Sequence, residues 1–204
     1  YDKVYQRYEG DIKIALIAPY IFDASVKQIF ASLLLGHTLH IIPEEARIDG
    51  ELLLDYYIAN RIDISDGTPI HLSILSNCSR ERLKRIPIRC FLIGGEALHN
   101  GIVESLLGKC NRNENTLDIV NVYGPTECCV DATSYLINQD NCNEDIVIGK
   151  PLNNVRLYVL DKYQKIVPIG IPGELYISGD GVARGYRNSQ ELTSSAFMED
   201  CYQD

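Results

Sequence analysis

The sequence predicts an α/β fold in which helices cover a parallel sheet, followed by a smaller antiparallel β-rich subdomain. Two observations predict this class. Over residues 1–140, short apolar runs alternate with segments whose apolar residues recur at helical spacing, as in a parallel sheet covered on both faces. Over residues 141–204, the apolar runs are separated by turn-rich segments, which is typical of antiparallel strands. We therefore expect an α/β subdomain at 1–140 and a β-rich subdomain at 141–204.

The first predicted helix, residues 23–35, follows a buried strand at 12–18. Apolar residues recur along this helix at helical spacing, and they are Val26, Ile29, Phe30, Leu33 and Leu34. Gly36 follows directly and suits the left-handed end of a helix. After a strand at 38–42, Asp49 can cap a second helix, because an aspartate side chain accepts hydrogen bonds from the first amides of a helix.

The later elements continue the alternation. Pro69 suits the first turn of a third helix, and Gly94 with Gly95 ends the strand before them. The remaining expected elements are, in chain order, strands 62–65 and 88–93, a helix near 102–107, strands 117–123, 155–160 and 174–178, and a short helix near 191–197.

Composition excludes several classes of function. A net charge of −9, with no basic run longer than residues 80–85, argues against a nucleic-acid partner, since such proteins concentrate lysine and arginine on one face. Seven cysteines without a C-x-x-C pair favour a reducing, cytoplasmic setting over a disulfide framework. No apolar run is long enough to span a membrane, and residues 1–10 do not have the pattern of a signal peptide.

Three loops at expected strand ends carry candidate ligand-binding residues, because open parallel sheets bind ligands at the carboxyl ends of their strands. They are residues 22–25, 94–96 and 123–127. In the third, Thr126 and Glu127 place a hydroxyl and a carboxylate side by side, a pair that suits a phosphate oxygen and Mg²⁺. Taken alone, this motif is better interpreted as a Gly-Pro turn with a solvated glutamate.

Three motifs together resemble a known family. Residues 121–127, Asn-Val-Tyr-Gly-Pro-Thr-Glu, resemble the Asn-x-Tyr-Gly-Pro-Thr-Glu motif of nonribosomal peptide synthetase adenylation domains. Residues 22–26, Phe-Asp-Ala-Ser-Val, resemble the pocket motif of these domains, and residues 173–186 resemble their Gly-Glu-Leu-x-Ile-x-Gly-x-Gly-Val-Ala-Arg-Gly-Tyr motif. Order and spacing fit along essentially the whole chain. The sequence is therefore similar to an amino-acid adenylation domain of the acyl-adenylate-forming superfamily.

The resemblance implies an activity and the residues that serve it. The family joins an amino acid to ATP, giving an aminoacyl-adenylate and pyrophosphate, and passes the product to phosphopantetheine on a neighbouring carrier domain, beside condensation domains. The implied nucleotide residues are Gly95 and Glu96 flanking adenine, Asn121 at the adenine edge, Tyr123 stacked on the base, Gly124 in the nucleotide loop, Thr126 at the α-phosphate and Glu127 on Mg²⁺. Thr126 and Glu127 are the implied catalytic pair, whereas residues 179–186 are expected to be a structural connection.

The resemblance also implies an amino-acid pocket. Asp23 would receive the α-ammonium of the substrate, although without the resemblance an aspartate before a helix is better interpreted as an N-cap. The other implied lining residues are Ala24, Lys27, Asp66, Leu92, Gly94, Val122, Val130 and Asp131. Lys27 could pair with a substrate carboxylate, and the two lining aspartates could orient it or could favour a basic substrate. Similarity to glutamate-activating pockets implies L-glutamate, with glutamine and then a basic amino acid as alternatives.

The chain departs from the family pattern at both ends. It shows neither the phosphate-binding loop that precedes the pocket motif nor the ribose-binding aspartate and catalytic lysine that follow. We therefore expect a central part of an adenylation domain, incomplete at both ends and inactive alone. A non-catalytic pocket fragment is the alternative from another class. A relative that activates acyl or aryl acids is a further alternative, but such acids would give Asp23 no ammonium partner.

Overall fold

The computed structural model describes residues 2–5, 7–8, 10–110 and 117–202, which form two compact units. The first unit comprises the chain through Tyr123 together with Ser134–Gly149, and the second comprises Gly124–Thr133 and the chain from Lys150 onward. The predicted class, a helix-covered parallel sheet followed by a small antiparallel sheet, is confirmed. Each unit combines two chain segments, so this grouping does not test the expected subdomain boundary between residues 140 and 141. That boundary stays a prediction.

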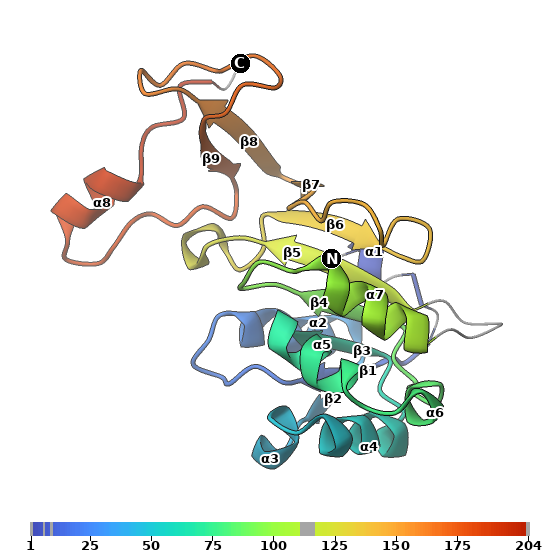
Figure 1. Cartoon of the computed structure of the whole chain (residues 1–204). Helices are drawn as coiled ribbons and strands as arrows, with labels where there is room; N and C mark the ends of the chain where they lie inside the picture. Colours follow the sequence, from blue (N-terminus) through green and yellow to red (C-terminus); the bar gives the residue numbers. More distant parts are fainter. Residues whose placement is uncertain (1, 6, 9, 111–116, 203–204) are drawn as a thin grey trace. The chain divides into compact units, whose positions relative to one another are not determined.

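The first unit is built on a sheet with the strand order β2-β1-β3-β4-β5-β6 (Figure 1). Neighbours among the first five strands are parallel. The strands are β1 (Lys13–Leu16), β2 (Thr38–Ile41), β3 (Ile64–Gly67), β4 (Cys90–Ile93), β5 (Asp118–Tyr123) and β6 (Thr133–Ile137). The helices are α1 (Asp2–Tyr5), α2 (Ala24–Leu35), α3 (Glu44–Arg47), α4 (Gly50–Asn60), α5 (Pro69–Ser76), α6 (Arg80–Leu83) and α7 (Asn100–Lys109).

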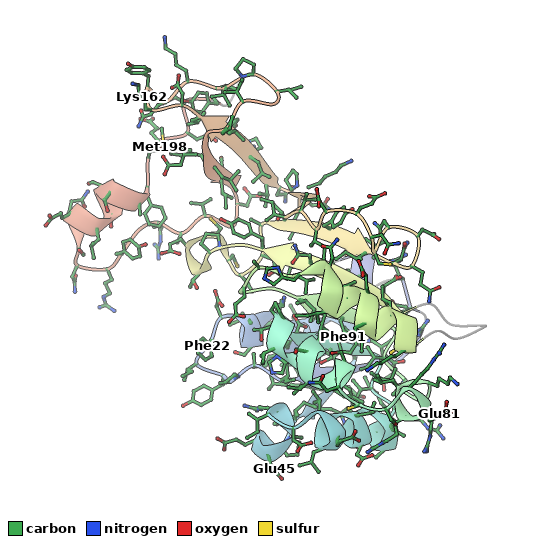
Figure 2. The ribbon with its side chains drawn as sticks, in the orientation of Figure 1. Phe22, Glu45, Glu81, Phe91, Lys162 and Met198 are labelled. Carbon is green, nitrogen blue, oxygen red and sulfur yellow. The ribbon has the colours of Figure 1, made fainter. Side chains whose placement is uncertain are left out.

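Side chains alternate between two cores on the two faces of this sheet, as the period of a strand requires. Phe91 and Ile93 pack in the larger core, which α4, α5 and α7 cover on one side of the strands (Figure 1). Cys90 and Leu92 pack in the smaller core on the opposite face. Figure 2 shows Phe91 inside this unit, where it is 1% exposed, whereas Phe22 is 59% exposed.

Helix α2 lies in the expected place but with its sides reversed. Its predicted apolar residues are mostly exposed, including Phe30, Leu33 and Leu34. Its buried residues are polar, and they are Ser25, Lys27, Gln28 and Ser32. Gln28 explains part of this arrangement, because its Oε1 accepts a hydrogen bond from Ile17 N at 3.0 Å, where β1 ends. The apolar spacing therefore predicted the helix correctly but not the side that faces the sheet.

Most predicted helix ends are confirmed. Asp49 caps α4, accepting hydrogen bonds from Glu51 N at 2.9 Å and Leu52 N at 3.0 Å, and Gly36 ends α2 in the left-handed region with φ of 74°. Strand β3 begins and ends two residues later than predicted, so that Asp66 is inside the strand. None of the helices within the described residues is long and apolar enough to cross a membrane.

The second unit contains an antiparallel pair of strands, β8 (Val155–Leu160) and β9 (Glu174–Gly179). Its other elements are the 3-10 turn η1 (Thr126–Cys128), the two-residue strand β7 (Lys150–Pro151) and the helix α8 (Gln190–Ala196). Leu152 N donates to Ala132 O at 2.9 Å, which joins the two chain segments of this unit.

Candidate functional site

Several predicted site residues meet at one edge of the first unit's sheet. Asp66 lies in β3 opposite Leu92 in β4, and Ile93 in β4 lies opposite Asn121 in β5. Because the carboxyl ends of parallel strands share an edge, Gly94 directly after β4 lies beside the end of β5. This edge is where open α/β sheets bind ligands.

A buried ion pair lies at this edge. Lys27 Nζ on α2 is 2.6 Å from Asp66 Oδ1, and the two side chains are 5% and 2% exposed. Burying one charge alone would be costly, so the two charges stabilise each other. Lys27 comes from the polar side of α2, and the reversal of this helix is what turns the ammonium toward the sheet.

Asp23 occupies the N-cap position of α2, yet its side chain makes no capping hydrogen bond. The N-cap alternative from the sequence is therefore right about the position and wrong about the interaction. The loop before the helix is held by other bonds. Ser25 Oγ donates to Tyr20 O at 3.1 Å, and Ser25 N donates to Phe22 O at 3.0 Å. Asp23 and Ala24 are both half-buried.

Glycine is needed at the two consecutive positions after β4 for different structural reasons. A Cβ on Gly94 would lie 2.7 Å from Val122 O, so no larger residue fits against β5. Gly95 has φ of +85°, in the left-handed region that favours glycine. Glu96, which follows, is exposed. The close packing of Gly94 lets the loop pass directly over the end of β5.

The end of β5 carries two of the implied nucleotide residues. Asn121 is 7% exposed, and its Nδ2 donates to Val147 O at 2.9 Å. This bond ties segment Ser134–Gly149 to β5, a structural task that the motif alone did not reveal. Tyr123 is the last residue of β5 and is 41% exposed.

The other predicted site residues belong to the second unit, where the chain turns tightly after β5. A Cβ on Gly124 would lie 2.6 Å from Val130 O, so the loop closes on its own backbone. Cys129 and Val130 follow with φ of 63° and 76°. Left-handed backbone is a genuine outlier for a β-branched residue such as valine, and such strain is common at functional sites. Asp131 next to it is half-buried.

Within this loop, Thr126 and Glu127 begin the 3-10 turn η1, with Thr126 exposed and Glu127 half-buried. The Tyr186 hydroxyl donates to Glu127 Oε1. This hydrogen bond lowers the pKa of Glu127 and raises the pKa of Tyr186. The accessible carboxylate of Glu127 and the hydroxyl of the preceding residue, Thr126, form a donor set that fits Mg²⁺ bound together with phosphate oxygens. Mg²⁺ takes few protein carboxylates.

Sequence reasoning missed two residues that support the site. Gln28 is fully buried on α2 next to Lys27 and holds the end of β1. Nothing in its spacing distinguishes it from a solvated glutamine. Tyr186 was assigned to a structural connection, and the only available signal was its place in the motif of residues 173–186.

Comparison with known proteins identifies the family. Residues 2–187 match the family described as AMP-binding enzyme. The chain belongs to this family. It is 45% identical over 205 residues to bacitracin synthase 1 of Bacillus licheniformis, and 44% identical over 199 residues to surfactin synthase subunit 1 of Bacillus subtilis strain 168. Each alignment covers 97% of the chain, which spans only 4% and 6% of the length of these relatives.

Solved structures of this AMP-binding family agree with the fold. One is a four-domain nonribosomal peptide synthetase bound to AMP and glycine, with a TM-score of 0.83 and 34% identity, covering 98% of this chain and 14% of that one. Another is a synthetase protein with adenylation and carrier domains bound to a vinylsulfonamide inhibitor. Its TM-score is 0.83 at 26% identity, covering 95% of this chain and 33% of that one. The resemblance to nonribosomal peptide synthetase adenylation domains is confirmed.

Proposed function

We propose that the polypeptide carrying this segment selects L-glutamate and activates it with ATP, forming glutamyl-adenylate and releasing pyrophosphate. The observation that carries the proposal is the Lys27–Asp66 pair, buried at the ligand-binding edge of a sheet that belongs to an AMP-binding enzyme. The AMP and glycine bound by a similar synthetase support the same type of reaction.

At the amino-acid end of the pocket, we assign one role to each of two charged residues, Asp23 and Lys27. Asp23, whose carboxylate caps no helix amide, would receive the α-ammonium of the substrate. Lys27 would receive the side-chain carboxylate. An ammonium has three donors, so Lys27 can hold Asp66 and a second carboxylate together. The other lining residues would shape the pocket, and they are Ala24, Leu92, Gly94, Val122, Val130 and Asp131.

The ion pair also ranks the alternatives. A basic side chain would need an acidic partner, and of the two lining aspartates Asp66 already lies 2.6 Å from Lys27, whose charge would repel a second cation. Glutamine can accept a hydrogen bond from Lys27 without charge pairing, and hydrogen bonds between charged groups are the stronger ones. The proposed order is therefore glutamate, glutamine and then basic amino acids.

The nucleotide roles follow the motif residue by residue. Tyr123, exposed at the end of β5, would stack on adenine, with Gly95, Glu96 and Asn121 along the base. In the second unit, Gly124 would keep the loop tight, Thr126 would bond the α-phosphate and Glu127 would hold Mg²⁺. When bound, Mg²⁺ neutralises phosphate charge. The protein residues supply alignment, since the substrate carboxylate itself attacks phosphorus.

The wider setting is proposed on the same basis. A carrier domain with phosphopantetheine would accept the aminoacyl group, and a condensation domain would use it. A similar synthetase structure contains adenylation and carrier domains, which supports the first of these partners. A cytoplasmic location is proposed from the seven cysteines, all of which are free thiols in the structure.

Amino-acid-dependent exchange of pyrophosphate into ATP tests the proposal. The complete synthetase polypeptide is assayed with each common amino acid in turn. Glutamate is expected to give the strongest exchange and glutamine the second. Strong exchange with lysine or ornithine and none with glutamate would contradict the assigned role of Lys27. No exchange with any amino acid would favour a non-catalytic relative.

A further inference from the structure

One loop of the second unit holds Glu127 at both its backbone and its side chain. The loop is residues 179–186, which we call the clamp loop. Its Ala183 N donates to Glu127 O at 2.7 Å, and its Tyr186 hydroxyl donates to Glu127 Oε1. At Gly181, a Cβ would lie 3.1 Å from Cys128 O, so the loop backbone packs closely against the turn η1.

Tyr186 is itself held from the other side by α8 and the residues around it. Tyr186 N donates to Thr193 Oγ1 at 2.9 Å. The Tyr186 ring lies edge-on to Phe197, with centroids 5.5 Å apart and an interplanar angle of 75°. Gly185 before it has φ of +125°, and a Cβ there would lie 2.5 Å from Thr193 Cγ2. The hydroxyl of Tyr186 is therefore aimed by packing that does not involve Glu127.

We infer that Tyr186 is a positioning residue for Glu127, an inference that rests on the proposed role of Glu127 as the Mg²⁺ ligand. Glu127 would hold the cation through its carboxylate while Oε1 accepts the hydrogen bond from Tyr186. A carboxylate on a half-exposed turn would otherwise keep more rotational freedom, and it would lose that conformational entropy on binding Mg²⁺. The clamp loop removes that freedom in advance. The motif of residues 173–186 thus serves the phosphate end of the reaction without touching substrate.

The chain offers a matched control. The Tyr176 hydroxyl also donates to a glutamate, Glu174 Oε2 at 3.2 Å, and it lies on β9 of the same unit. Tyr176→Phe removes a tyrosine–glutamate hydrogen bond of the same kind away from η1. Tyr186→Phe keeps the ring that packs on Phe197, so both variants are expected to fold.

The test measures ATP affinity by calorimetry, with and without Mg²⁺, in the complete synthetase polypeptide. Tyr186→Phe is expected to reduce the Mg²⁺-dependent gain in affinity by about fivefold to tenfold, within the size of one typical net hydrogen bond, and to leave Mg²⁺-free affinity unchanged. Amide hydrogen exchange at Glu127 and Cys128 is expected to accelerate in Tyr186→Phe. Tyr176→Phe is expected to change neither measurement.

The outcomes separate the inference from the proposed function. If Tyr186→Phe matches Tyr176→Phe in the Mg²⁺-dependent gain, the positioning role of Tyr186 is wrong, even where Glu127→Gln abolishes the gain. If Glu127→Gln keeps the full gain, the proposed Mg²⁺ role of Glu127 is wrong, and the inference falls with it.

Discussion

Asp66 of the first unit and Glu127 of the second unit are both acidic residues with a proposed ligand-binding role, but they are held in opposite ways. Asp66 lies inside a strand of the first unit, is 3% exposed and is paired with Lys27 at 2.6 Å. Glu127 lies on a short turn of the second unit, is half-buried and receives a hydrogen bond from Tyr186. The first is fixed by burial and an opposite charge, and the second by a loop that packs around it.

The difference suits two kinds of chemistry. Selecting a side chain by its charge requires a dry place, because electrostatic interactions are strong only where water is excluded. Binding a hydrated cation with phosphate requires access to water, because Mg²⁺ keeps several of its waters. Breaking a buried ion pair costs more free energy than breaking an exposed hydrogen bond. The predictions below use this contrast, from the largest expected effect to the smallest.

Removing the charge of Asp66 should be the most damaging change to stability. Asp66→Asn leaves the Lys27 ammonium buried beside a neutral amide, and breaking a buried pair costs about 3–5 kcal/mol. Urea denaturation measures the loss in the free energy of unfolding. Glu51→Gln is the control, because the ion pair between Glu51 and Arg82 is largely exposed and its loss should cost much less free energy. Equal losses in both variants would show that burial does not determine how much free energy is lost when an ion pair is broken.

Changing Lys27 should alter the choice of substrate, and the loss of glutamate-dependent exchange should exceed the loss that lower stability would cause. In Lys27→Gln, glutamate-dependent exchange is expected to fall roughly a hundredfold, the effect of losing a buried charge pair worth about 3 kcal/mol. The double variant Lys27→Gln with Asp66→Asn removes both charges of the pair and should prefer glutamine. If this double variant still prefers glutamate, Lys27 does not read the substrate's charge.

Adding a Cβ at Gly94 should have an intermediate effect on the free energy of unfolding. A Cβ there lies 2.7 Å from Val122 O, so Gly94→Ala must move the end of β5 and should cost about 1–3 kcal/mol. Gly101→Ala in α7 is the control, because a Cβ there meets no atom within 4 Å and alanine favours helix. Thermal unfolding that ranks the two variants in the reverse order would contradict the close packing at β5.

The pH dependence of the Glu127 bond should be the smallest effect. The hydrogen bond from Tyr186 lowers the pKa of Glu127 below its ordinary value of 4.5. A carboxyl with a lowered folded-state pKa contributes stability above its ordinary pKa and loses it as pH falls through the lowered value. Tyr186→Phe should therefore lower the melting temperature slightly at about pH 7 but not at about pH 3. A difference that is constant with pH would exclude this bond as its source.

The sequence predicted the fold well where local chemistry decides the structure. Asp49 caps α4, Gly36 ends α2 and Gly94 follows β4, because each depends on one residue's conformational or hydrogen-bonding preference. The strand β6 was missed, because its alternation is weak. The two-segment make-up of each unit was also missed, because it depends on contacts between distant parts of the chain.

The sequence named candidate site residues, which stay predictions, but not the interactions that the structure shows for them. Spacing placed Asp23 and Lys27 on one helix, but it could not show that α2 turns its polar side to the sheet. Periodicity measures how apolar residues are spaced and carries no information on what covers them. The Lys27–Asp66 contact joins residues 39 positions apart and was one of two possibilities left open by the sequence. The task of Tyr186 likewise depends on a turn 59 residues away.

The most direct test of the central claim is a crystal structure of the complete adenylation domain with a non-hydrolysable glutamyl-adenylate analogue. We expect the side-chain carboxylate of the analogue within hydrogen-bond distance of Lys27 Nζ, with Lys27 still paired to Asp66, and its α-ammonium at Asp23. An analogue whose side chain lies away from Lys27, or whose ammonium does not contact Asp23, would contradict the account.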